Sequence, residues 1–165
     1  MITEYLEDRW PKMSEETAQQ RAAVRLFVER FNAAMSYMAL LRADEGSEAE
    51  AEAREALVAG MKSVDAFLLE YADAQGPFFF GDNFAMAEEA CAPFALRLWH
   101  VLPAMRPQHS PAALLEEHKL DRLKAWLEAV VERPSVKATA MAPDEMVSSF
   151  ASMVERMKAM AATAK

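Results

Sequence analysis

Apolar residues recur every three or four positions along residues 24–41, and this spacing constrains the fold more than any other feature of the chain. The residues that share it are Val24, Phe27, Val28, Phe31, Met35, Met38 and Leu41. An α-helix places such positions on one side, so the spacing predicts one long helix with a single buried stripe. Ser14, with Thr17 beyond it, offers an N-cap for this helix. Glu15 and Glu16 suit the positive end of its dipole.

The rest of the chain repeats this pattern between Pro-rich and Gly-rich breaks. A second stripe is predicted at Leu57, Met61, Val64, Leu68 and Tyr71, with a charged outer face at Glu50, Glu52, Arg54 and Glu55. We expect a further helix from about Met86 to His100, closed at Leu102-Pro103. Another is expected over residues 112–133, after a loop at 106–111. After Pro143 the last stripe is Met146, Phe150, Met153, Met157 and Met160.

Composition favours the same fold class. The 165 residues include only four glycines, and the good helix formers alanine, leucine, methionine and glutamate dominate. Met1 to Trp10 also has the character of a short helix, stopped by Pro11. The sequence therefore predicts an all-α bundle of about five to seven helices, with little room for a sheet.

Charge and hydropathy exclude several classes of protein. A net charge of −8 argues against nucleic-acid binding, which needs a clustered basic face. No apolar run approaches the roughly 18 residues of a membrane span, so we expect no direct membrane insertion. The acidic first residues contain no targeting segment, and the single Cys91 forms no internal disulfide. We expect a cytoplasmic protein; an organellar address removed before residue 1 stays open.

The residue types that carry chemistry do not form a recognisable site. His100, His109 and His118 are spaced nine residues apart without the clustering of a metal site, which favours ordinary surface or boundary histidines. Cys91 is expected to be buried and inert, because Glu88 and its neighbour oppose a thiolate. The sequence predicts no catalytic, cofactor-binding or metal-ligating residue. The methionines of the last stripe are either core or a soft surface for a partner.

Four segments, taken in order, resemble the C-terminal half of a cytosolic glutathione transferase. They are "ITEYLEDRWP", "RAAVR", "FFFGDNFAMAEEACAPFALR" and "LKAWLEAVVERPSVKAT", and the resemblance extends over residues 2–140. It implies two units: residues 1–10, similar to the last helix of the family's thioredoxin-like domain, and residues 14–165, the helical domain. Pro93 and Arg97 match the Pro and Arg usual along the family's central helix.

The resemblance also implies how that central helix begins. In the family a Ser/Thr-x-x-Asp box caps it, and the matching residues are Asn83, Phe84, Ala85 and Glu88. Ala85 has no oxygen to act as a cap, but Glu88 can still reach back to the Ala85 amide. Asn83 or Asp82 is a substitute cap. We expect the phenylalanines Phe78, Phe79, Phe80 and Phe84 to plug this loop onto the bundle; an aromatic ligand pocket is the alternative.

The functional residues of the family cannot be transferred to this chain. In the family, the thioredoxin-like domain supplies the catalytic Tyr, Ser or Cys, a cis-proline and a Glu-Ser pair for glutathione, and none has a counterpart here. No cofactor is therefore expected, and glutathione only if such a domain is supplied. The helical half contributes an apolar co-substrate cleft, which the resemblance places near Tyr37, Met38, Arg97 and Trp99.

Two functions follow from this resemblance. The first is a non-catalytic module for protein–protein interaction, a subunit of a larger assembly, whose partner covers an exposed interdomain face near Tyr5, Trp10 and the first long helix. The second is a glutathione transferase, of the omega or dehydroascorbate-reductase type, whose glutathione-binding domain is absent from this sequence. A helical domain that carries an apolar ligand is a third interpretation.

Overall fold

The structure is a computed structural model that describes residues 5, 9 and 17–163. Over these residues it is helical, and its only β-type pairings are two isolated bridges within residues 78–83. The elements are α2 (Ala18–Ala34), α3 (Met38–Arg42), α4 (Glu48–Tyr71), α5 (Met86–Met105), the 3₁₀ turn η1 (Pro107–His109), α6 (Pro111–Glu117), α7 (Asp121–Glu132), α8 (Pro134–Thr139) and α9 (Pro143–Thr163). The predicted all-α bundle is confirmed.

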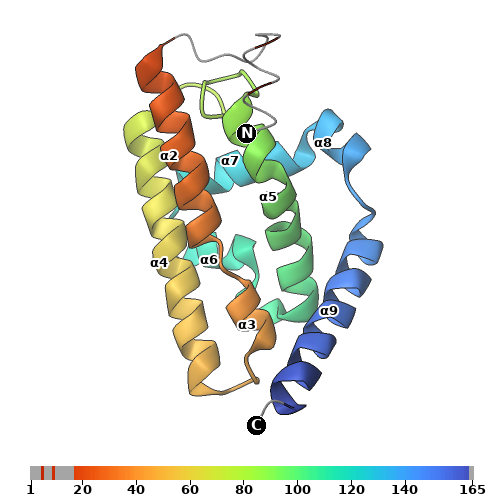
Figure 1. The fold of residues 1–165 in the computed structure, drawn as a ribbon. Coiled ribbons are helices and arrows are strands. Elements are labelled where there is room, and N and C mark those ends of the chain that lie inside the picture. The colour runs from red at the N-terminus through yellow and green to blue at the C-terminus, as the bar shows by residue number, and fades with distance from the viewer. Residues whose placement is uncertain (1–4, 6–8, 10–16, 164–165) are drawn as a thin grey trace.

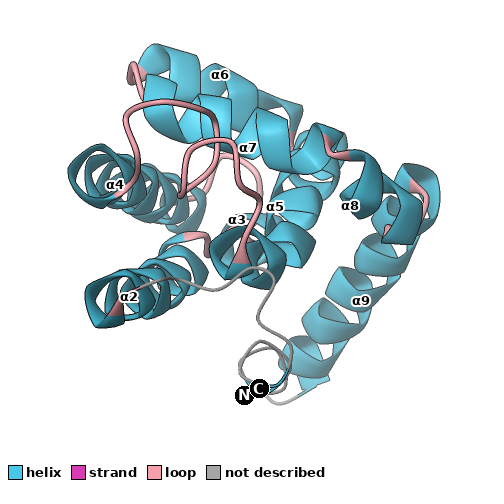
Figure 2. Cartoon of the chain, turned by 90° about the horizontal axis from the view of Figure 1, so that it is seen from above, coloured by secondary structure: helices cyan, strands magenta, loops and turns pink. Residues whose placement is uncertain are grey.

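Helix α5 lies at the centre of the bundle, and the other helices surround it (Figures 1 and 2). On one side α2 and α4 pack together in opposite directions, and α2 also contacts α5. Helices α6 and α7 cover a second side of α5, and α9 covers a third. Among the described residues, no helix combines the length and the apolar character that a membrane crossing requires.

The first predicted helix is divided into two helices. Thr17 caps α2 in a capping box with Gln20, as Thr17 Oγ1 accepts from the Gln20 N–H and Gln20 Oε1 from the Thr17 N–H. The helix ends at Ala34, and a tight turn leads into α3. Met35 and Tyr37 are both buried, although an unbroken helix would place residues two apart on opposite sides. The prediction of one continuous helix was therefore wrong. The chain turns between α2 and α3, because only a turn lets both side chains enter the core.

The predicted N-terminal features lie largely outside the described residues. Tyr5 and Arg9 are helical and exposed, whereas the predicted cap Ser14 and the acidic residues Glu15 and Glu16 are among the positions not described. Trp10 also falls there. Because α2 begins at Ala18, no acidic residue occupies its first turn.

Two predicted boundaries near the middle of the chain were wrong. Helix α5 continues through Pro103 to Met105, and the expected loop after it contains η1. The helix predicted over residues 112–133 is divided into α6 and α7, with Lys119 in the left-handed conformation (φ 54°). Asp65 explains this division: its carboxylate accepts a hydrogen bond from the Leu123 N–H at 2.8 Å and caps the start of α7 from α4.

Most of the predicted stripes form the core, with three corrections. Leu57, Met61, Val64 and Leu68 are buried, but Tyr71, the last residue of α4, is 52% exposed. In α9 Met146 is buried, while Met157 and Met160 are exposed and Val154 is buried in their place. The end of α9 is only partly covered: Lys158 Nζ lies 3.9 Å from Asp44 Oδ1, whereas Met157 and Met160 stay at the surface. Glu50, predicted on the outer face of α4, is buried.

Candidate functional site

The start of α5 is held by Glu88, whose side chain is fully buried. Its Oε1 accepts hydrogen bonds from the Phe79 N–H and from Trp126 Nε1, both at 2.8 Å, and its Oε2 accepts one from the Ala85 N–H at 3.0 Å. Burial raises the pKa of this carboxyl, and the three donors act in the opposite direction. The half capping box expected from the sequence is therefore present. The Glu88 carboxylate also joins the loop to α7, because the same oxygen accepts from Phe79 and from Trp126.

The phenylalanines of the loop pack inward, as expected. Phe79 is fully buried and lies 5.1 Å from the Phe27 ring, and Phe78 meets Phe84 edge to face at 5.4 Å. Arg122 donates from its guanidinium to the Pro77 and Phe78 carbonyls, which closes the loop from α7. In this described part of the chain, the side chains of Asn83 and Asp82 do not cap α5, so the expected substitute cap is absent. The loop therefore packs as a plug on the bundle, and Phe84 also lines the pocket described next.

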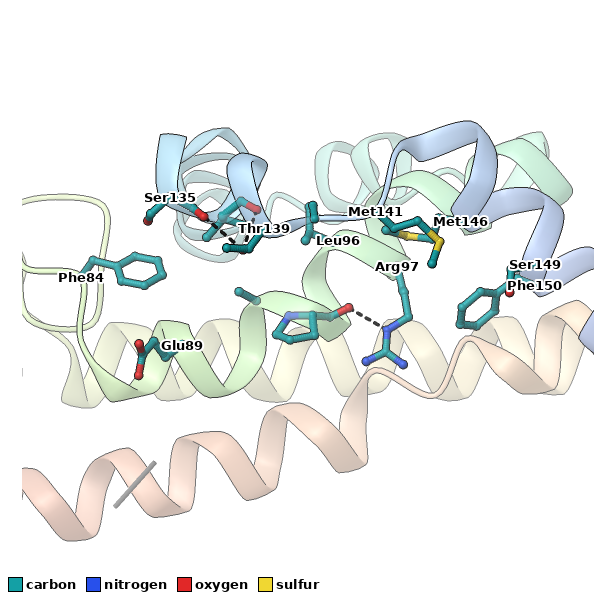
Figure 3. Close-up of a pocket in the computed structure, with 14 residues that line it drawn as sticks. Phe84, Glu89, Leu96, Arg97, Ser135, Thr139, Met141, Met146, Ser149 and Phe150 are labelled. Carbon is teal, nitrogen blue, oxygen red and sulfur yellow. Dashed lines mark hydrogen bonds between the residues drawn. The ribbon is translucent and has the colours of Figure 1, made fainter. Parts of the chain in front are cut away.

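A pocket of about 740 Å³ opens between α5, α8 and α9 (Figure 3). One wall comes from α5, where small side chains leave room beside the larger residues of the other helices. The opposite wall comes from α8, from α9 and from the segment between them. The lining residues are Phe84, Glu89, Ala92, Pro93, Leu96, Arg97, Ser135, Val136, Thr139, Ala140, Met141, Met146, Ser149 and Phe150.

The local sequence explains why the pocket forms here. Residues 90–96, "ACAPFAL", place Ala92 and Pro93 at the pocket, and neither side chain is long enough to fill the space. Ala140, the C-cap residue that follows α8, is also small. Phe84 lies at one end of the pocket (Figure 3). Phe150 lies at the other end and comes from α9. The result is a cavity with mostly aliphatic and aromatic walls.

Arg97 is the one cation among the residues that line the pocket. Its Nε donates to the Pro93 carbonyl at 2.7 Å, and the guanidinium carbon lies 4.5 Å from the centre of the Phe94 ring. Burial raises the pKa of the Tyr37 phenol, and the charge of Arg97 acts in the opposite direction. A second guanidinium, that of Arg133, covers the Phe84 ring at 4.1 Å just beside the pocket.

The structure separates the four residues of the predicted cleft. Arg97 lines the pocket, but Tyr37 is 5% exposed in the core, and Met38 and Trp99 are half-buried and pack against that core. Sequence spacing missed the α8 and α9 residues that form the other wall. No local signal marks Val136, Ala140 or Phe150 as neighbours of α5, because η1, α6 and α7 separate α8 and α9 from it in the chain.

The remaining candidate groups serve the fold. Nε2 of the buried His109 lies 3.0 Å from the Glu50 carboxylate, so the expectation of a surface or boundary histidine was wrong at this position. The Gly46 N–H, and after it His109, hold the pKa of Glu50 below its ordinary value. Cys91 is fully buried, as expected, and burial raises the pKa of its thiol. The described residues contain no cluster that could hold a metal ion.

Comparison with known proteins identifies the family. A model of the glutathione S-transferase C-terminal domain matches residues 22–139. The chain belongs to this family. A search of curated proteins gave no match.

Solved structures of glutathione transferases share the fold of this transferase C-terminal domain. A tau-class enzyme from mango is similar with a TM-score of 0.72 and 20% identity, over 92% of this chain and 67% of that one. Glutathione transferase Omega 3C of Trametes versicolor is similar with a TM-score of 0.63 and 22% identity, over 95% of this chain and 64% of that one. The trimeric Leishmania glutathione transferase TDR1 is similar with a TM-score of 0.62 and 20% identity, over 88% of this chain and 30% of that one. The chain thus spans between about a third and two thirds of these proteins.

Proposed function

We propose that this chain is the co-substrate-binding half of a glutathione transferase, and that its α5–α8–α9 pocket holds an apolar small molecule. The observation that carries this proposal is the pocket of about 740 Å³ itself. Ligand sites of proteins are typically concave, roughly 300–1,000 Å³ in volume and mainly apolar, with few polar groups. The walls formed by Phe84, Leu96, Val136 and Phe150 meet that description.

Glutathione and the group that activates its thiol come from a second unit in this proposal. The solved relatives are longer than this chain, and the family resemblance implies that a thioredoxin-like unit provides the glutathione site. The described carboxylate and thiol at the centre of the bundle, Glu88 and Cys91, are fully buried and face the core. They support the start of α5 and its packing, and neither reaches the pocket.

A neutral fluorescent probe tests the binding step. N-phenyl-1-naphthylamine, titrated into the 165-residue chain, is expected to bind and gain fluorescence. Ala140→Trp fills the pocket and is expected to weaken binding by tenfold or more, while leaving the helical content unchanged. Ala138→Trp is the matched control, because Ala138 is exposed on α8 two residues before Ala140 and does not line the pocket. Equal binding by both variants would place the probe elsewhere and refute the proposal.

A second candidate function, a non-catalytic docking module, is favoured by apolar side chains that α2 and α4 expose. Leu26 is 55% exposed, Leu69 68% and Tyr71 52%, and Tyr5 is also exposed. Exposed apolar surface of this kind is often covered by a partner protein. Native mass spectrometry of the protein taken from its own source distinguishes the two functions. A chain of 18.4 kDa inside a larger assembly favours docking, and a chain longer by one domain favours the transferase.

A third measurement asks about catalysis directly. The isolated chain is expected to leave 1-chloro-2,4-dinitrobenzene and dehydroascorbate unchanged in the presence of glutathione. Turnover of either substrate by the purified chain would show that it carries its own thiol-activating group.

A further inference from the structure

Methionine lines the pocket at two positions that differ in their exposure to solvent. Met141 lies in the segment 140–142 between α8 and α9 and is 52% exposed. Met146 lies in the first turn of α9 and is 7% exposed. Both residues line the pocket, and Figure 3 shows them on its α9 side, away from Phe84. Solvent therefore reaches the side chain of Met141 and hardly reaches that of Met146.

This difference matters because a thioether can be oxidised, and its susceptibility follows its exposure. Hydrogen peroxide is a sufficient oxidant. The sulfur lone pair attacks one peroxide oxygen, so that an S–O bond forms and the O–O bond breaks, and the departing hydroxide takes up a proton and leaves as water. The sulfur loses two electrons and the peroxide gains them. The product is methionine sulfoxide, which sulfoxide reductases return to methionine with a dithiol as reductant.

A sulfoxide at Met141 would change the pocket without disrupting the bundle. Sulfoxides are polar and destabilise a protein when they form in a packed core. Met141 is exposed and lies outside the helices, so water can solvate its sulfoxide in the ligand-free chain. An apolar ligand that covers this wall removes the water and offers no donor, and burying a polar group without a hydrogen bond costs free energy. Oxidation of Met141 therefore opposes binding while it preserves the fold.

We propose that Met141 is a site of reversible oxidation that controls the pocket between α5, α8 and α9. With the thioether the pocket holds apolar molecules, and with the sulfoxide it holds them more weakly. The inference rests on the proposed function of the pocket, because it names a regulation of the same site.

Other methionines of the chain supply the controls. Met160 is 72% exposed and Met157 is 37% exposed, and neither is among the residues that line the pocket. Oxidation of these two side chains is not expected to affect binding. Met61 is fully buried in the core and represents a protected thioether. Comparison of these positions separates the effect of where the sulfur lies from the effect of its exposure.

Peptide mapping by mass spectrometry tests the modification by itself. The chain is treated with hydrogen peroxide, catalase removes the excess, and cleavage before Asp144 places Met141 and Met146 in separate peptides. Met141 is expected to be oxidised at least about fivefold faster than Met146 or Met61, because access limits the attack on the sulfur. Equal rates at Met141 and Met146 would refute the assignment of the site.

The neutral probe N-phenyl-1-naphthylamine measures the consequence for binding. Oxidation of the wild-type chain is expected to weaken probe binding about tenfold, the effect of one buried polar group left without a partner. Met141→Leu keeps an apolar side chain that peroxide does not oxidise, and its affinity is expected to stay within about twofold under the same treatment. Met160→Leu is the matched control and is expected to lose affinity as the wild type does.

Two further measurements exclude damage to the fold. Circular dichroism of the oxidised wild type is expected to show unchanged helical content, and sulfoxide reductases with dithiothreitol are expected to restore probe binding. Met141→Gln, which brings a polar group to this position without peroxide, is expected to weaken binding. Met160→Gln is expected to leave it unchanged. A loss of helical content that accompanies the loss of binding would refute control at the pocket.

The outcomes keep the two proposals apart. If the untreated chain binds the probe and full conversion of Met141 leaves the affinity unchanged, the proposed function stands and this inference is refuted. If Met141→Leu loses as much affinity on oxidation as the wild type, another side chain carries the effect and the role of Met141 is refuted. If the untreated chain does not bind the probe, the proposed function fails and the control of binding fails with it.

Discussion

The indole N–H of Trp126 donates a hydrogen bond to the carboxylate of Glu88 at 2.8 Å, and both side chains are fully buried. The same carboxylate accepts from the backbone of Phe79 and of Ala85. One carboxyl group thus holds together α7, the phenylalanine loop and the first turn of α5, which forms one wall of the pocket.

Glu88→Gln is expected to lower the free energy of unfolding by about 2 kcal/mol, because a glutamine has one acceptor oxygen for three N–H donors. Urea denaturation followed by circular dichroism measures this difference. Glu128→Gln, on the exposed side of α7, is the control and is expected to change stability by less than about 0.5 kcal/mol. A Glu88→Gln protein as stable as the original would show that the three hydrogen bonds contribute nothing net.

Ala85→Ser is expected to stabilise the fold by about 1 kcal/mol, because Ala85 occupies the N-cap of α5 in an extended conformation without a side-chain cap. The serine oxygen can accept from the Glu88 N–H and complete the capping box. Ala85→Val, which adds bulk without an oxygen, is the control and is expected to give no such gain. A lower melting temperature for the serine variant would contradict the assignment of the cap.

Gly60→Ala is expected to destabilise the protein by about 1–3 kcal/mol, although alanine normally favours a helix over glycine. A Cβ at Gly60 would lie 2.4 Å from the Ala34 carbonyl oxygen, so α2 and α4 would have to move apart. Ala56→Gly, at an exposed position of the same helix, measures the ordinary propensity and is expected to cost about 1 kcal/mol. A stabilised Gly60→Ala protein would mean that the helices adjust without strain.

The Glu50 carboxylate is expected to make stability dependent on acid pH. The Gly46 N–H and His109 lower its pKa in the folded state, so its contribution is present above the ordinary pKa of about 4.3 and is lost as the pH falls through the lower folded value. The melting temperature of the wild type is therefore expected to fall more steeply between about pH 5 and pH 3 than that of Glu50→Gln. Parallel pH profiles would exclude Glu50 as a source of this dependence.

Cys91 is expected to be unreactive in the folded protein. Burial, and to a lesser extent the charge of Glu88, raises the pKa of its thiol, so the nucleophilic thiolate is disfavoured. Titration with 5,5′-dithiobis(2-nitrobenzoate) is expected to detect one thiol only after denaturation, and Cys91→Ser supplies the background. Rapid labelling of the native chain would show that α5 opens or that the thiol is accessible.

Local sequence was sufficient for some parts of the candidate site. Phe84 was expected at the loop before α5 and Arg97 along that helix, and both line the pocket. The opposite wall was not predictable, because nothing in the local sequence around Val136 and Phe150 indicates that they lie close to α5. The predicted cleft failed at Tyr37 for a related reason: spacing indicates that a residue is buried, but not whether it faces the core or a cavity.

The sequence by itself determined the fold class, most of the buried stripe of α4 and the family, because helical spacing and the order of short motifs are properties of neighbouring residues. Only the tertiary structure decided where the helices divide and where the pocket lies. Asp65 caps α7 at Leu123 across 58 residues, and Glu50 is buried because His109 meets it from η1. Such partners are far apart in the chain, so hydrogen bonding and packing select them only once the bundle has formed.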